Sequence, residues 1–127
     1  MDDNEQSQIE EEFLKSWDWA EVFYSDLGAY YELVQKSMLK LIAELRVRGY
    51  DRKLRAGQQM FTFIVSRVRK YGLQTGQARL SIYVSPKGVT TISYKGSDGL
   101  VELEFENAEF TPELESLLER LLAHPID

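Results

Sequence analysis

The chain has 127 residues, of which 43% are hydrophobic and 28% charged, with no cysteine and a formal net charge of −6 at pH 7. This composition is that of a globular domain, and it excludes a disordered chain, a disulfide scaffold and a thiolate metal site. The acidic N-terminus does not resemble a signal peptide, and the longest uncharged run, 56–66, is about half of the ~20 residues that a membrane-spanning helix needs. We therefore expect a cytoplasmic protein that does not enter a membrane.

Charge is unevenly distributed along the chain. Residues 1–12 carry six acidic and no basic residues, and residues 98–127 carry nine acidic residues against Arg120. Between Lys40 and Lys70 there are nine basic residues against two acidic ones. The middle of the chain is therefore the part that can attract an anion or an acidic partner, unless the acidic ends neutralise it within the fold.

The sequence contains no internal repeat, low-complexity tract or linker between domains. Residues 1–8 are acidic and polar, so we expect them to form a disordered N-terminal segment. Residues 9–125 are then expected to form a single domain.

Two helices are predicted before residue 50. Apolar residues within Ile9–Tyr24 recur at helical spacing and predict the first helix. Ser25 and Asp26 supply capping oxygens for a second helix over about 26–48, which carries one apolar stripe and ends at Gly49.

The segment from 52 to 71 is harder to assign. Residues Met60–Val65 are rich in strand formers, and short apolar runs cannot be assigned by periodicity alone. Four apolar residues nevertheless share one helical face: Leu54, Phe61, Val65 and Val68. Basic residues follow, and Gly72 with Leu73 repeats the stop at Gly49. We predict a helix over 52–71 and keep a strand over 58–66 as the alternative.

Beyond residue 76 the apolar period changes to that of strands. Alternation predicts strands over 79–84, 89–94 and 100–106, joined by turns at 85–88 and 96–99. In the last strand three apolar residues alternate with three glutamates, Glu102, Glu104 and Glu106. This pattern indicates a sheet with one buried and one acidic face.

A final helix is predicted after these strands. Thr111 is suited to cap it, Pro112 fits its first turn, and His124 with Pro125 ends it. The fold class is therefore α+β, with N-terminal helices, two long and one shorter, followed by a three-stranded antiparallel β-meander and a C-terminal helix. We expect the helices to pack on one face of the sheet.

Catalytic signals are weak. His124 is the only histidine and lies near the C-terminus, where we interpret it as a helix-end cation or a solvent-exposed group. The glutamates of the last strand resemble an exposed face, and no glycine-rich segment has the spacing of a phosphate-binding loop. We therefore expect that the protein is not an enzyme and has no metal site and no cofactor.

The candidate binding residues are five cations that flank the uncharged segment and are called the basic belt: Arg52, Arg55, Arg67, Arg69 and Lys70. Arginine suits bidentate contact with carboxylate or phosphate. The alternative is that these side chains pair within the fold, with the strand glutamates, with the N-terminal acids or with helix ends.

A second candidate is the aromatic cluster between Trp17 and Tyr31. Trp17 and Trp19 cannot share a helical face, so one of them is expected to leave the core. Trp19 is the candidate for an interface, where an apolar body with a polar tip is favoured.

The sequence thus predicts a small interaction or regulatory module. It would bind a protein partner, or itself as a homodimer, through the basic belt and the aromatic helix surface. One alternative is nucleic-acid binding along the 46–70 belt, although the pI of about 4.9 argues against it. Another is a small ligand sensor with a pocket between helices and sheet.

Overall fold

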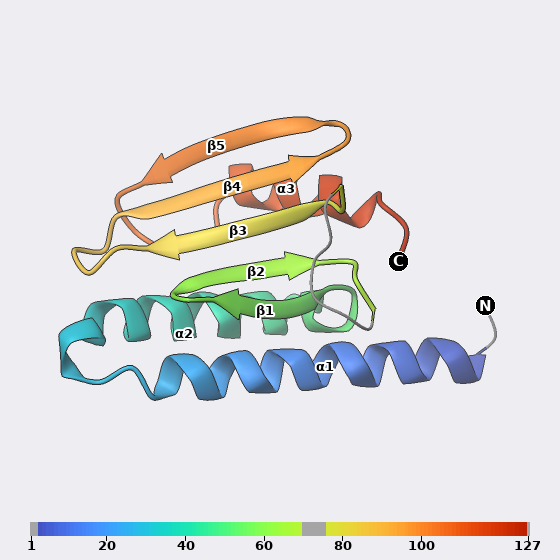
Figure 1. Ribbon diagram of the computed structural model, residues 1–127, viewed down its shortest axis with the longest axis horizontal. Helices are drawn as coiled ribbons and strands as arrows, with labels where there is room; N and C mark the ends of the chain where they lie inside the picture. Colours follow the sequence, from blue (N-terminus) through green and yellow to red (C-terminus); the bar gives the residue numbers. More distant parts are fainter. Residues whose placement is uncertain (1–2, 70–75, 127) are drawn as a thin grey trace.

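The computed structural model describes residues 3–69 and 76–126 (Figure 1). Its helical elements are α1 (Asp3–Ser25), the 3-10 turn η1 (Ala29–Tyr31), α2 (Glu32–Val47), the 3-10 turn η2 (Tyr50–Arg52) and α3 (Pro112–Leu122). Its strands are β1 (Arg55–Gln59), β2 (Thr62–Ser66), β3 (Arg79–Val84), β4 (Thr90–Gly96) and β5 (Gly99–Phe105). In the described chain they form one antiparallel sheet in the order β1-β2-β3-β4-β5. The α+β class is confirmed, but the sheet has five described strands instead of three.

The helix predicted over 52–71 is wrong within its described part, which forms the hairpin of β1 and β2. Ala56 pairs with Val65 and Gly57 with Ile64, and Met60 turns the chain with φ of 55°. Glycine and β-branched residues are poor helix formers, and the strand arrangement buries Ala56 and Val65 on the inner side of the sheet. The stop expected at Gly72 lies outside the described residues.

The first two helices differ from their expected bounds. The α1 helix begins at Asp3, ahead of the start near Ile9 that the apolar period predicts. Ser25 does not cap α2, because its hydroxyl donates back to the Glu21 carbonyl at 2.7 Å. The α2 helix begins at Glu32, and no side chain caps its first turn. The link between the two helices is therefore longer than the sequence suggests.

Other helix ends are as expected. Gly49 adopts the left-handed conformation, with φ of 87°, directly after the end of α2. At α3 the Thr111 hydroxyl accepts a hydrogen bond from the Leu114 N–H at 3.1 Å. These two signals depend only on local backbone geometry, which is why the sequence predicts them correctly.

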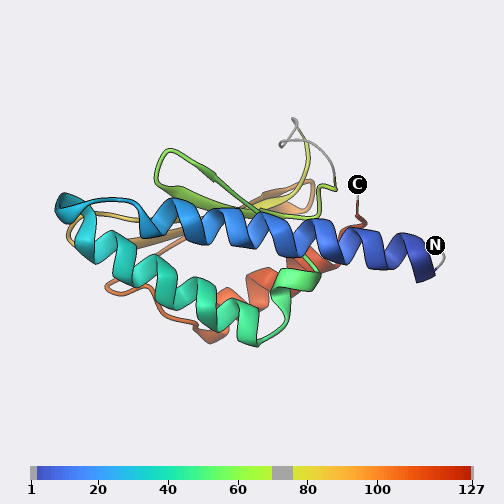
Figure 2. The ribbon, with the colours of Figure 1, turned by 90° about the horizontal axis from the view of Figure 1, so that it is seen from below.

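The helices leave one face of the sheet open. In Figure 1 α2 and α3 lie behind the sheet, and Figure 2, turned by 90°, shows both on the same side of the strands. The α1 helix runs along β1, where Ser16 Oγ accepts a hydrogen bond from the Ala56 N–H at 2.8 Å. Trp17 Nε1 donates to the Leu54 carbonyl at 2.8 Å. These bonds occupy backbone groups at the β1 edge, so α1 covers that edge.

The core fills the space between the inner face of the sheet and the helices. Trp17 of α1 meets Phe63 of β2 edge to face, with ring centroids 5.4 Å apart. Tyr94 and Leu118 extend the buried cluster toward α3. Each fully buried side chain of this size contributes roughly 1.5–3 kcal/mol to folding. The core therefore supports one face of the sheet, and no described helix lies over the other face.

Candidate binding site on the outer sheet face

The face of the sheet turned away from α2 and α3 is called the outer face. In the described chain no helix lies over it (Figures 1 and 2). Side chains of a strand alternate between the two faces, and residues directly opposite on neighbouring strands point to the same face. The strand register therefore determines which residues lie side by side on this face.

One row across the outer face is basic. Arg55 on β1 pairs with Ser66, which pairs with Arg79 on β3, which pairs with Lys95 on β4. We call Arg55, Arg79 and Lys95 the basic row. Directly opposite residues have their Cβ atoms about 4.5–5.5 Å apart, and like charges in such pairs are destabilising. The pairing of Arg79 with Lys95 therefore does not serve the stability of the sheet.

No carboxylate neutralises the basic row within the described chain. Arg55 Nη1 donates to the main-chain carbonyl of Arg69. The side chains of Arg79 and Lys95 make no hydrogen bond or ion pair with any other described residue. Within the described chain, these three cations thus lie in one row at one end of the outer face and form no ion pair with a carboxylate.

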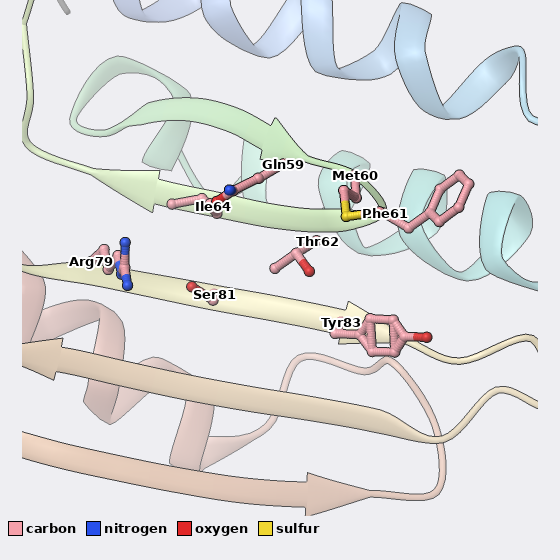
Figure 3. A pocket seen from close by; sticks show the side chains of 8 residues that line it. All are labelled: Gln59, Met60, Phe61, Thr62, Ile64, Arg79, Ser81 and Tyr83. Carbon is pink, nitrogen blue, oxygen red and sulfur yellow. The ribbon is translucent and has the colours of Figure 1, made fainter. Parts of the chain in front are cut away.

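A hollow of about 410 Å³ adjoins the basic row (Figure 3). It is lined by Gln59, Met60, Phe61, Thr62, Ile64, Arg79, Ser81 and Tyr83. Arg79 belongs to both the hollow and the basic row, and Tyr83 lies four residues along β3, or about 13 Å away. Ile64 supplies an apolar surface between them. The hollow therefore offers a cation, a phenol and apolar contact within one open surface.

In the middle of the outer face, two of three neighbouring cross-strand residues are small, a glycine and a serine. Gly57 lies opposite Ile64, which lies opposite Ser81. A Cβ atom added at Gly57 would meet no heavy atom within 4 Å. The backbone of β1 is therefore accessible beside the hollow.

The structure brings together only part of the predicted basic belt. Arg55 lies in the basic row, Arg52 is exposed on η2, and Lys70 lies outside the described residues. Arg69 pairs with Glu12 and with Glu5, at 3.2 Å each. Pairing within the fold, which the sequence left open, therefore holds for Arg69.

Arg67 is a partly buried cation that contacts carbonyls. Its Nε donates to the His124 carbonyl and its Nη1 to the Lys53 carbonyl, each at 3.0 Å. Burial lowers the pKa of Arg67 from its usual value. Both bonds hold chain segments together, so Arg67 joins the hairpin to the C-terminal end.

The acidic strand face does not neutralise the basic belt. Glu102 and Glu104 lie on β5, at the sheet edge opposite β1, and both are exposed. They share the outer face with the basic row, because Glu102 pairs with Ser93 and Glu104 with Thr91. The outer face is therefore basic over one end of β1–β4 and acidic along β5.

The two tryptophans of α1 have opposite surroundings. Trp17 is fully buried, whereas Trp19 is 70% exposed, so the argument that one must leave the core is confirmed. Val22, one turn beyond Trp19, is also exposed. Tyr31 packs on Phe61 at the hairpin tip, with ring centroids 4.5 Å apart. The rest of the cluster is packed, and Trp19 and Tyr30 are left at the surface.

His124 is not a simple solvent-exposed group. Its Nε2 lies 2.7 Å from the Tyr94 hydroxyl and 3.2 Å from Asp98 Oδ1, and Arg120 Nε donates to Asp98 Oδ2 at 2.8 Å. The hydrogen bonds from Tyr94 and then Arg120 hold the pKa of Asp98 well below its usual range. These four groups satisfy one another, which is typical of a joint between a helix end and a strand turn.

A second hollow, of about 260 Å³, lies between α2 and the segment after β5. It is lined by Lys40, Leu41, Glu44, Ala108, Glu109 and Phe110. Its volume is below the roughly 300 Å³ at which small-molecule pockets usually begin. Among the described residues there is no group of three or more metal-ligating side chains, and no helix is long and apolar enough to cross a membrane.

Comparison of the chain with protein-family models, with curated proteins and with solved structures gave no significant match. Sequence reasoning missed Arg79, although it occupies an outward position of a predicted strand, and Lys95, which lies one residue beyond the predicted strand over 89–94 but within β4. Their alignment with Arg55 depends on the register of β1–β4, which no sequence signal specifies once residues 55–66 are taken for a helix.

Proposed function

We propose that the protein is a binding module that holds an acidic segment of a partner protein on the outer face of β1–β4. The observation that carries the proposal is the basic row of Arg55, Arg79 and Lys95, which has no carboxylate partner in the described chain and adjoins an open hollow. A carboxylate at Arg79 gains a charge-assisted hydrogen bond and relieves the repulsion between Arg79 and Lys95. An apolar side chain of the same segment can lie in the hollow over Ile64.

Charge around the basic row favours a short acidic segment over a long polyanion. Glu102 and Glu104 lie on the second strand from Arg79, more than about 10 Å away, and the chain as a whole carries −6. A nucleic acid that extended across the sheet would meet these carboxylates. Base stacking also needs several rings on an open surface, and among the described residues the hollow offers Tyr83 and Phe61. We therefore place nucleic acid second.

A second copy of the chain is the other protein that can supply the acid. Glu102 and Glu104 of one copy can approach the basic row of another when two outer faces meet. A partner segment is favoured because a flat acidic row does not fill the hollow. A small-ligand sensor is the third candidate, and a thermal-shift screen against metabolites and metals would detect it.

Fluorescence anisotropy with defined probes tests the proposal. The probes are a labelled peptide in which glutamate alternates with leucine, a lysine–leucine peptide of equal length, and single-stranded oligothymidylate. The matched variants are Arg79→Glu with Lys95→Glu on the outer face, and Lys36→Glu with Lys87→Glu on exposed positions elsewhere. Both pairs change the net charge equally.

We expect the acidic peptide to bind, and the outer-face pair to weaken it by at least about tenfold, or about 1.4 kcal/mol. The Lys36 and Lys87 pair should change affinity much less. Equal weakening by both pairs, or tighter binding of oligothymidylate, would contradict the proposal. Sedimentation equilibrium on the same variants tests whether the ligand is a second copy of the chain. In that case the parent would be a dimer, and the variant with Arg79→Glu and Lys95→Glu would be a monomer.

A further inference from the structure

The two edges of the sheet are treated differently by the fold. The β1 edge is covered by α1, through hydrogen bonds of Ser16 to the Ala56 N–H and of Trp17 to the Leu54 carbonyl just before β1. At the opposite edge β5 has β4 on one side, and Figure 1 shows no described element beyond it. From Leu100 to Phe105, no hydrogen bond joins the β5 backbone to any described segment except β4. Its outward N–H and C=O groups are thus available to another strand.

The side chains of β5 form two contrasting rows beside this free edge. On the outer face Glu102 and Glu104 are exposed. On the inner face Val101, Leu103 and Phe105 are only half-buried, although Ile92, the β4 partner of Leu103, is 1% exposed. The core is therefore incompletely covered along β5, and its apolar strip ends at an open edge.

We propose that β5 accepts an additional strand from a partner protein, in which lysine or arginine alternates with apolar residues. Strand addition pairs the free backbone groups of the edge. Because side chains alternate, every second residue of the added strand lies beside Glu102 and Glu104, and the others extend the apolar strip of Val101, Leu103 and Phe105. Cross-strand pairs of opposite charge favour the basic residues at the first set of positions.

A second copy of β5 does not meet these requirements. If two β5 strands paired edge to edge with their outer faces continuous, the glutamates of both copies would share one face. Like charges at close cross-strand positions are destabilising, so Glu102 and Glu104 oppose self-pairing. This site is also separate from the basic row and takes a segment of the opposite charge, so it stands whether or not an acidic segment binds β1–β4.

The test uses the full chain and three labelled peptides of equal length. One alternates lysine with valine, one contains the same residues in scrambled order, and one has prolines in place of alternate valines. The variants are Glu102→Lys with Glu104→Lys on β5, and Asp26→Lys with Glu109→Lys on exposed positions outside the strands. Both pairs change the net charge equally. Anisotropy measures affinity, and hydrogen exchange measures protection of the β5 amides.

We expect the alternating peptide to bind and to slow hydrogen exchange of amides within 100–105. The scrambled peptide, the proline peptide and the β5 variant should each bind at least about tenfold more weakly, while the Asp26 and Glu109 variant binds nearly as the parent does. Equal binding of alternating and scrambled peptides, unchanged exchange along β5, or equal binding by both variants would overturn the proposal. Failure of the alternating peptide to bind would overturn it as well.

Discussion

Trp17 and Trp19 show how two positions on one helix decide the role of a side chain. Trp17 is fully buried against Phe63 and donates a hydrogen bond to the Leu54 carbonyl, so it fixes both the core and the β1 edge. Trp19 points away from the core and is 70% exposed. The same substitution at the two positions therefore separates a structural role from a surface role.

We expect Trp17→Ala to lower the free energy of unfolding by about 3–5 kcal/mol, because it leaves a large cavity and an unpaired carbonyl. Trp19→Ala should change it by no more than about 0.5 kcal/mol. Urea denaturation followed by circular dichroism measures both. A large loss of stability for Trp19→Ala would show that this side chain is packed in solution, as in a dimer.

Tyr94 makes the stability of the fold sensitive to alkaline pH. Burial, with the nearby Asp98 carboxylate, raises the pKa of Tyr94 from 10.0 to about 12. The phenol is neutral in the fold, so its contribution is fully present below about pH 10 and is lost as the pH rises through about 12. We expect Tyr94→Phe to be less stable than the parent at pH 7 and the difference to shrink by pH 11. Denaturation at both pH values measures it, and a constant difference would contradict this role.

At the scale of elements, two glycines have opposite requirements. Gly49 ends α2 with φ of 87°, a conformation that side chains with a Cβ atom rarely adopt. Gly57 lies within β1 in open space, and its φ is not in that left-handed range. Gly49 is needed for its backbone conformation, whereas Gly57 leaves the outer face accessible.

We therefore expect Gly49→Ala to lower the free energy of unfolding by about 1 kcal/mol and Gly57→Thr to raise it by up to about 1 kcal/mol. Thermal and urea denaturation of the two variants check the prediction. A loss of stability for Gly57→Thr would mean that β1 needs a bare backbone there for a reason the described contacts do not contain.

The elements that the sequence predicted correctly are those with local signals. The period of two identified β3, β4 and β5, and the Thr111 cap and Pro112 identified the start of α3. The hairpin of β1 and β2 was missed because a short apolar run fits both the helical period of 3.6 and the strand period of two. Tertiary packing, such as that of Phe63 against Trp17, decides between helix and strand. Treating residues 55–66 as a helix also hid the register that aligns Arg55 with Arg79.

At the scale of the whole molecule, charge is partitioned between surfaces. The acids of α1 pair with Arg69, the acids of β5 are exposed at the far edge, and the basic row lies between them with no carboxylate partner among the described residues. From the sequence, only the excess of positive charge in the middle of the chain could be predicted. Which cations remain free depends on the sheet order, which determines how far each lies from an acid.

The most direct measurement is an NMR titration of the isotope-labelled protein with the glutamate–leucine peptide. Our account predicts that the largest amide shifts fall on β1, β2, β3 and β4 around Arg55, Ile64, Arg79 and Lys95, and that amides of α2 and α3 shift little. Shifts centred on the helices or on the 108–110 segment, or no shifts at all, would contradict binding at the outer face.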